Sequence, residues 1–345
     1  MDLNHIKLSV LDQSPVRKGA TAEQALQETV TLAKHADQLG FHRFWVAEHH
    51  NTTSLAGSAP EVLMAHLAGQ TKNIRIGSGG VMMPNHSALK VAENFRLLEA
   101  LFPGRIDLGM GRAPGTDRLT ASVLNPNNKF SEQDFIEQLY DLQNYFHNNA
   151  EPGTIQERIK AIPMAQTAPK QWLLSSSGGS VKFAAHFGTG LVFAHFINPY
   201  GGAEAVKAYC DHFKPSVDFA LPEAAVAIFV FCSDDEEKVM RHQAVMDFRF
   251  LQLERGMGLT PVGYDDIKNE LYTPAEQERI VYNRKRIIAG NSEHVKEKLI
   301  KLATDYNIDE IIAITITEDF EDRLNSYSNL HSLFLTENKT LEYAG

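Results

Sequence analysis

Short apolar runs alternate with helical patterns along almost the whole chain, and this alternation restricts the fold more than any other feature. Uninterrupted runs of Val, Ile, Leu and Phe are typical of strands that are buried on both faces of a parallel sheet. Eight strand–helix units favour a closed (β/α)8 barrel, an α/β fold, over an open doubly wound sheet. The eight expected strands are Ile6–Asp12, His42–Glu48, Ile74–Met82, Arg105–Gly111, Gln171–Ser176, Gly190–Phe196, Ala224–Cys232 and Asp309–Ile316.

Capping signals indicate where several of the intervening helices begin. Thr21 and Gln24 offer a capping box, in which each side chain bonds to the backbone of the other residue. Ser131 can cap a later helix, and Thr273 with Glu276 three residues further on is a strong start signal. Further helices are expected at residues 60–70 and 88–101, and in the stretch from 291 that leads into the last strand.

The chain has 345 residues and no evident linker, so we expect a single barrel domain over residues 1–345. Two connections are longer than a barrel needs. Residues 112–130 follow the fourth strand and are rich in Pro, Gly and Asn, and residues 233–290 follow the seventh strand. Both connections follow strands and so belong to the carboxyl-terminal face of the barrel, where barrel enzymes have their active sites. We therefore expect 233–290 to be an insertion and a candidate lid.

Charge and cysteine usage narrow the classes of partner. A formal net charge of −10 argues against nucleic acid and against an anionic membrane surface as partners. The two cysteines, Cys210 and Cys232, form no CxxC motif and no disulfide framework, as is usual in a reducing compartment. The longest apolar run, Ala224–Cys232, is too short to span a bilayer, and no signal peptide is visible. These features predict a cytoplasmic protein.

Consecutive glycines at the end of the third expected strand need an explanation. Ser78 is followed by Gly79 and Gly80, and glycine weakens a strand interior. A β-bulge would account for them, and so would a backbone that approaches a flat ligand closely. The residues themselves leave both interpretations open.

Two stretches are suited to a phosphate. Arg112 follows the fourth strand, where a guanidinium serves a phosphate or a surface salt bridge equally well. The fifth strand ends in a turn that contains Ser176, Ser177, Gly178, Gly179 and Ser180 and leads into a helix. Free N–H groups at a helix start, with hydroxyl groups beside them, bind anions without a lysine. An ordinary N-cap requires fewer such residues, so the turn favours phosphate.

Polar residues also end two of the expected strands. Glu48, His49 and His50 end the second strand, and His195 ends the sixth. Adjacent residues of an extended strand point to opposite sides, and neither H-x-H nor H-E-x-x-H occurs, so we expect no metal site. Near a phosphate site, a histidine at a strand end is suited to acid–base chemistry.

The order of five motifs resembles the bacterial luciferase-like flavin monooxygenases, and in particular their general oxidoreductase branch. The resemblance extends from Ser9 to about Ile316. The five motifs are "FWVAEHH", "IGSGGVMMP", "RIDLGMGR", "SSSGGSVKFAAHFG" and "GNSEHVKEKLIKLATDYNIDEIIAI".

The resemblance implies a monooxygenase that uses reduced FMN, supplied by a separate flavin reductase, to activate O2 through a peroxide adduct of the flavin. It also implies a small organic substrate and a homodimer that forms through helices near the second and third strands. The residues that it assigns to the cofactor are Ser78, a cis-linked Gly79–Gly80 under the flavin ring, Gly111, Arg112, Ser176, Ser177, Gly178, Gly179 and Ser180.

The same resemblance places His49 near the reactive edge of the flavin as the catalytic residue. Glu48, His50 and His195 are expected to support the site, and one of Glu48 and His50 is expected to orient His49. Two departures argue against light emission. Gly111 stands where light-emitting luciferases carry a reactive cysteine, and His195 replaces a tryptophan.

Three alternatives remain open at this stage. Relatives of the same fold use the deazaflavin F420 for hydride transfer without oxygen. Other relatives bind flavin without catalysis. A metal-dependent barrel hydrolase built on His49, His50 and His195 is the third alternative.

Overall fold

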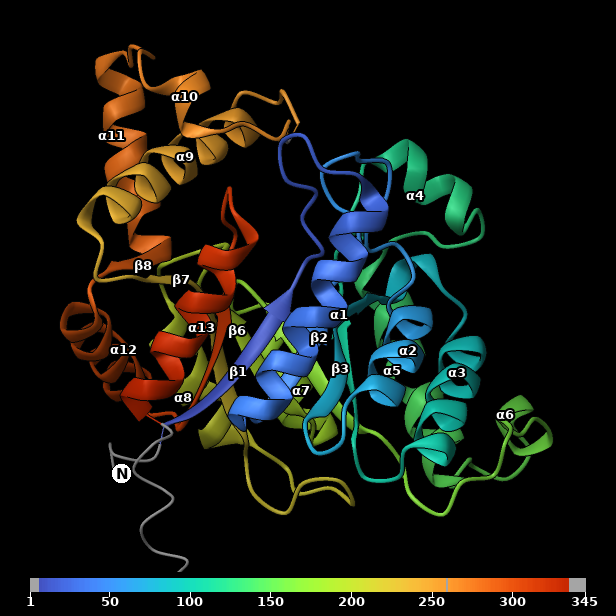
Figure 1. Ribbon diagram of the computed structural model, residues 1–345. Coiled ribbons are helices and arrows are strands. Elements are labelled where there is room, and N and C mark those ends of the chain that lie inside the picture. Colours follow the sequence, from blue (N-terminus) through green and yellow to red (C-terminus); the bar gives the residue numbers. More distant parts are fainter. Residues whose placement is uncertain (1–5, 259, 335–345) are drawn as a thin grey trace, which may run out of the picture.

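Eight parallel strands form a closed barrel in the computed structural model, which describes residues 6–258 and 260–334 (Figure 1). Each strand pairs with its neighbours in the order β6-β5-β4-β3-β2-β1-β9-β7, and pairing of β6 with β7 closes the ring. The fold expected from the sequence is therefore confirmed. The barrel strands are β1 (Lys7–Asp12), β2 (Arg43–Val46), β3 (Arg75–Met82), β4 (Ile106–Gly111), β5 (Lys170–Ser175), β6 (Gly190–Ala194), β7 (Ala224–Cys232) and β9 (Glu310–Ile314).

A further short strand, β8 (Ile287–Gly290), lies outside the ring and was not expected from the sequence. It pairs only with the end of β7, from Phe229 to Cys232, whereas β9 pairs with β7 from Val226 to Phe229. The nine residues of β7 are enough for both partners. Because β8 has only four residues and is partly exposed, it lacks the buried apolar run that identified the others.

Helices surround the barrel (Figure 1). The helices expected at residues 60–70 and 88–101 are confirmed with those bounds. The main helices outside the barrel are α1 (Ala22–Leu39), α2 (Pro60–Gln70), α3 (Ala88–Leu101), α5 (Glu132–His147), α7 (Val181–Phe187), α8 (Gly202–His212), α12 (Ser292–Tyr306) and α13 (Phe320–Phe334). Shorter helices are η1 (Met83–Asn85), α4 (Arg118–Leu124) and α6 (Ile155–Arg158).

The capping signals act as the sequence predicts. Thr21 and Gln24 form a reciprocal capping box at the start of α1, and Thr273 and Glu276 form one at α11 (Pro274–Asn283). Ser131 likewise caps α5. Each box satisfies N–H groups that the first turn of a helix leaves without partners. Helix α4 was not expected, because it lies within the connection 112–130, whose composition is typical of a loop.

Buried charges close the amino-terminal end of the barrel. The guanidinium of Arg43 donates to Glu310 at 2.6 Å and to Asp107 at 3.0 Å, and Ser9 donates to the same glutamate at 2.7 Å. All four side chains are buried. In barrel enzymes this end serves stability, and the opposite end carries the chemistry.

The connection 233–290 contains α9 (Glu236–Glu254), α10 (Tyr264–Ile267), α11 and η2 (Arg284–Arg286), and it ends with β8. Figure 1 shows α9, α10 and α11 beyond the ends of the barrel strands. Lys18, after β1, pairs with Asp266 of α10 at 2.5 Å, and the backbone N–H of Tyr264 donates to Glu318, after β9, at 2.7 Å. These two contacts attach the segment to the loops that follow β1 and β9.

No helix within the described residues is both long enough and apolar enough to cross a membrane.

Candidate active site

A cavity of about 240 Å3 opens at the carboxyl ends of the barrel strands. It is the place where the predicted phosphate residues and the predicted catalytic histidine come together. Its walls are mostly apolar and include Leu11, Trp45, Ala47, Leu174, Val192, Ala194, Phe196, Ile197, Ala227 and Ile312. The predicted site residues that line it are His49, Gly79, Gly111, Arg112, Ser176, Ser177 and Ser180.

Of the two glycines predicted for the cofactor on β3, Gly79 lines the cavity and Gly80 does not. The Gly79–Gly80 peptide is cis, and the pairing of β3 with β4 shifts register between Gly79 and Val81. A Cβ atom at Gly79 would lie 2.7 Å from Leu11, and one at Gly80 would lie 2.7 Å from the carbonyl oxygen of Gly109. A larger residue at Gly80 would collide with this backbone carbonyl, whereas one at Gly79 would require the side chain of Leu11 to move. The register shift agrees with the bulge interpretation, and Gly79 also borders the cavity, where a ligand could approach the backbone.

Ser78 does not reach the cavity. Its hydroxyl donates to the carbonyl of Gly109 at 2.8 Å and accepts from the N–H of the same residue at 3.0 Å. The side chain is fully buried. It therefore joins β3 to β4, and any part that it plays in cofactor binding is indirect.

Arg112 lies at the edge of the cavity beside the serine turn. A Cβ atom at Gly179 would be 2.9 Å from Nη2 of Arg112, so glycine leaves room for the guanidinium there. Nη1 of Arg112 lies 3.1 Å from a carboxylate oxygen of Glu132, at the start of α5, and Lys182 lies 3.0 Å from the other oxygen. Hydrogen bonding from Lys182, with the charge of Arg112 beside it, lowers the pKa of Glu132. Two cations thus meet at the edge of this site.

Glu132 and Lys182 were not among the residues predicted for the site. Glu132 belongs to the "SEQD" signal, which was interpreted only as a helix start, and Lys182 follows the serine turn directly. The sequence contains no sign that the start of α5 lies against that turn.

The serine turn leaves two hydroxyl groups unused. Ser180 occupies the N-cap position of α7, but its side chain makes no capping hydrogen bond. Within the described residues, no hydrogen bond is formed by the hydroxyl of Ser176 or Ser180. Ser175 donates to the carbonyl of Ser177 and so stabilises the turn itself. The ordinary N-cap explanation therefore does not account for Ser180.

His49 is the only one of the predicted histidines that lines this cavity. Burial lowers its pKa, although a backbone hydrogen bond with Gly115 and the charge of Glu48 act in the opposite direction. The imidazole is therefore neutral at neutral pH and can accept a proton.

Glu48 does not orient His49, contrary to one expectation. Its fully buried carboxylate accepts from His50 at 2.8 Å, from His86 at 2.9 Å and from Asn85 at 3.0 Å. Burial raises the pKa of Glu48, but these partners outweigh it and leave the pKa lowered. Burial lowers the pKa of His86, but the hydrogen bond to Glu48 and the charge of that carboxylate outweigh burial and leave the pKa raised. Adjacent side chains of an extended segment point to opposite sides, so Glu48 and His49 face different surroundings.

His195 also faces away from the cavity. Its ring nitrogens lie 2.7 Å from the hydroxyl of Tyr306 and 3.0 Å from the carbonyl of Lys285. It therefore joins the end of β6 to α12 and to the segment before β8. The three histidines of the hydrolase alternative have separate partners, and the described residues contain no group of three potential ligands that could hold a metal ion.

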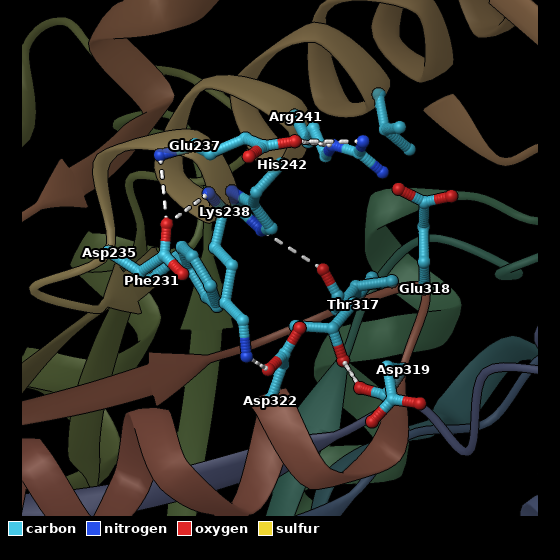
Figure 2. Close-up of a pocket in the computed structure, with 12 residues that line it drawn as sticks. Phe231, Asp235, Glu237, Lys238, Arg241, His242, Thr317, Glu318, Asp319 and Asp322 are labelled. Atoms are coloured by element: carbon cyan, nitrogen blue, oxygen red, sulfur yellow. Dashed lines mark hydrogen bonds and ion pairs between the residues drawn. The ribbon is translucent and has the colours of Figure 1, made fainter. Parts of the chain in front are cut away.

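A second cavity, of about 410 Å3, lies between the start of α9 and the chain that follows β9. Figure 2 shows the charged side chains of its wall joined in pairs, Lys238 with Asp322 and Arg241 with Glu237. No residue predicted for the active site lines this cavity. It is the larger of the two cavities.

The closed barrel, with a cavity at the carboxyl ends of its strands, defines the class: a (β/α)8-barrel protein with the usual enzyme site of that fold. The particular family follows from the sequence as a whole. The model of the luciferase-like monooxygenases matches residues 6–306, so the chain belongs to the luciferase-like monooxygenase family. The resemblance inferred from the five motifs is confirmed.

Several relatives match over nearly their whole length. YwcH of Bacillus subtilis (strain 168) is 50% identical, over 95% of this chain and 99% of the relative. An N-acetyl-S-alkylcysteine monooxygenase of the same organism is 36% identical, over 96% of this chain and 98% of the relative. The crystal structure of apo-MsnO8 is 33% identical with a TM-score of 0.88, and the match covers 96% of this chain and 98% of that one. The chain thus has the family and fold of monooxygenases and related oxidoreductases.

Two more distant structures share the fold but differ in cofactor. The oxygenating constituent of 3,6-diketocamphane monooxygenase from Pseudomonas putida, in complex with FMN, is 18% identical with a TM-score of 0.69, covering 96% of this chain and 98% of that one. An F420-dependent secondary alcohol dehydrogenase is 13% identical with a TM-score of 0.67, covering 93% and 97%. Proteins of this fold therefore include binders of FMN and of F420.

Proposed function

We propose that the protein is an FMN-dependent monooxygenase that uses reduced FMN and O2 to oxidise a small organic substrate. A separate flavin reductase would supply the reduced FMN, as expected from the family resemblance. The single observation that carries this proposal is the convergence of Arg112 with two uncommitted serine hydroxyls at the edge of one apolar cavity.

The residues present fit the FMN phosphate. Arg112 offers a planar fork of N–H donors, which suits a phosphate better than a point charge does. The hydroxyls of Ser176 and Ser180 are free to donate, and Gly179 keeps the guanidinium close to the turn. In the FMN complex, the phosphate would take the place of the Glu132 carboxylate beside Arg112 and Lys182.

The cavity suits the flavin ring as well. Gly79 and Gly111 present backbone to it, and Leu174, Val192 and Phe196 present apolar side chains. When bound, reduced FMN supplies the electrons that activate O2. Apolar walls exclude the water that would otherwise divert the oxygen chemistry to hydrogen peroxide. We also propose that residues 233–290 act as the lid that completes this exclusion.

His49 would hold and transfer a proton at the reacting centre. Its pKa is lowered by burial, so the neutral imidazole is the form present at neutral pH. Transfer by a positioned side chain typically contributes about 10²–10⁴-fold to the rate. Glu48, with His50 and His86, would keep the preceding chain in place without reaching the reacting atoms.

Arg112→Ala tests the assignment of the phosphate site. Removal of a charged hydrogen-bond donor costs about 1.5–3 kcal/mol, so we expect the Kd for FMN to rise by roughly 10- to 100-fold. Riboflavin lacks the phosphate, and its Kd should change by less than about twofold. The measurement is fluorescence titration of both flavins against wild type and variant.

Arg118→Ala serves as the matched control, because Arg118 is exposed at the start of α4 and lines no part of the cavity. Equal losses for FMN and riboflavin in Arg112→Ala would remove this residue from the phosphate site. F420 is titrated in parallel, and binding of F420 without FMN would favour the dehydrogenase alternative. Oxygen consumption above that of free reduced FMN distinguishes an enzyme from a flavin-binding protein without catalysis.

A further inference from the structure

The inward face of α9 carries an unusual set of buried residues. His242, Met246, Arg249 and Phe250 recur at helical spacing and are all buried. Figure 2 shows His242 directed from α9 toward the chain after β9, where its ring nitrogen lies 3.0 Å from the carbonyl of Ile316. This contact fixes the direction in which the whole stripe faces, toward the barrel.

The same stripe borders the apolar interior that forms the candidate active site. Met246 and Phe250 belong to the hydrophobic cluster that also contains Leu11, Val192 and Ala227, and these three line the 240 Å3 cavity. Arg249 lies between the two apolar residues on the helix, seven positions after His242. A helix turns through almost two full turns in seven residues, so Arg249 and His242 lie on the same side of α9.

Arg249 has no partner among the residues that the structure describes. The residue is only 8% exposed. Within the described residues, its guanidinium forms no hydrogen bond, ion pair or stacking contact. The other buried arginines differ in this respect. Arg43 pairs with Asp107 and Glu310, Arg323 pairs with Asp12, and Arg96 donates to backbone carbonyls.

Gln252 adds a second uncommitted group. It lies one turn after Arg249 on α9, is 5% exposed, and its side-chain oxygen has no hydrogen-bond partner. A buried cation without a partner is strongly unfavourable, and a buried polar group without a partner is unfavourable as well. Burial lowers the pKa of Arg249 to about 10, and no carboxylate acts against it. The guanidinium nevertheless remains charged at neutral pH.

We propose that Arg249 binds the carboxylate of the substrate, so that the enzyme acts on small carboxylic acids with an apolar chain. This rests on the proposed function, because it names the substrate class of the same site. The carboxylate would accept hydrogen bonds from the N–H groups of Arg249, and the apolar chain of the substrate would lie in the hydrophobic cluster toward the cavity. A neutral substrate would leave the guanidinium buried and unpaired.

The test compares hexanoate with hexanamide, which have nearly the same shape and differ in charge. Binding of each is measured by calorimetry to the protein saturated with FMN. In wild type we expect hexanoate to bind at least tenfold more tightly than hexanamide. Arg249→Met should abolish this preference and leave both ligands equally weak. Arg241→Met is the matched control, because it removes a charge from the same helix that is already paired with Glu237.

Thermal unfolding without ligand provides a readout that depends on no substrate. Replacement of an unpaired buried charge by an apolar side chain should raise the melting temperature of Arg249→Met by about 2 °C or more. An equal affinity of wild type for hexanoate and hexanamide would overturn the proposal, and this comparison requires no variant. Arg249→Met that melts lower than wild type and still prefers hexanoate would overturn it too.

Titration of the same samples with FMN distinguishes failure of the carboxylate site from failure of the proposed function. FMN binding without a preference for hexanoate would refute the carboxylate proposal and leave the proposed function standing. A preference for hexanoate without FMN binding would refute the proposed function and retain Arg249 as a carboxylate site.

Discussion

Glu48, His49 and His50 are adjacent in the chain, yet they lie in different surroundings. His49 lines the cavity, whereas His50 donates to the buried carboxylate of Glu48. The same carboxylate accepts from His86, which is 38 residues away in sequence. At the scale of single residues, position along an extended segment decides which histidine can reach a substrate. The others hold the wall in place.

His49→Asn tests the catalytic assignment. We expect kcat/KM to fall by about 10²–10⁴-fold while the Kd for FMN stays unchanged, because the residue moves a proton and does not hold the phosphate. Since burial lowers the pKa of His49 from its ordinary value of 6.5, wild-type activity should persist below pH 6.5 and fall as the pH drops through the lowered pKa. The variant should lack this acidic limb.

His66→Asn is the control for this experiment, since His66 is exposed on α2. The measurement is the pH dependence of steady-state kcat/KM for each protein with a common flavin reductase. An acidic limb that persists unchanged in His49→Asn would assign it to another group.

The two ends of the barrel strands have different tasks. At the amino-terminal end, Arg43 joins β2 to β4 and β9 through Asp107 and Glu310, and all of these groups are buried. At the carboxyl end, backbone glycines and uncommitted hydroxyls border the cavity. At the scale of elements, one end therefore holds its buried charges in pairs, and the other retains unused hydroxyl groups for a ligand.

Arg43→Met tests this division. The substitution removes the arginine that pairs with buried Glu310 and one of the two arginines that pair with buried Asp107, so we expect the free energy of unfolding to fall by about 3–5 kcal/mol. Lys7→Met is the control at the same end of the barrel, because Lys7 and Asp309 form an exposed pair that should contribute at most about 1 kcal/mol. Both values come from urea unfolding, and similar losses in the two variants would contradict the assignment.

At the scale of the whole molecule, two features bear on the proposed lid and dimer. They are the attachment of residues 233–290 and the exposed apolar side chains of the outer surface. The segment is attached to loops after β1, β6 and β9, and its action as a lid stays a proposal. On the outer surface, Val62 of α2 and Leu97 and Leu101 of α3 are 73%, 52% and 59% exposed. These helices follow the second and third strands, where the family resemblance places a dimer contact. We propose that these exposed apolar side chains form the contact of a homodimer.

Leu97→Glu combined with Leu101→Glu tests the dimer. Two carboxylates on one side of α3 would place like charges in the apolar contact, so we expect a monomer where wild type is a dimer. Sedimentation velocity gives the mass of each. Leu119→Glu is the control, because Leu119 is equally apolar and 76% exposed on α4. A wild-type monomer, or a double variant that stays dimeric, would place the contact elsewhere or remove it.

The barrel could be predicted from the sequence because its signals are local. An apolar run, a capping box or a pair of glycines involves residues that are close in the chain, and all eight ring strands were expected. Strand β8 and helix α4 escaped prediction, since β8 is short and partly exposed and α4 lies in a loop-like composition. The serine turn and Arg112 were also found locally, as residues of the right type at strand ends.

The partners of those residues could be known only from the tertiary structure. The sequence alone determined which groups stand at the ends of the strands, and folding decided that Glu132 meets Arg112, that His195 turns to Tyr306 and that Arg249 stays unpaired. The physical reason is that these relations join segments that are far apart in the chain. Whether a charge is paired depends on what the fold brings next to it, and no local pattern records that.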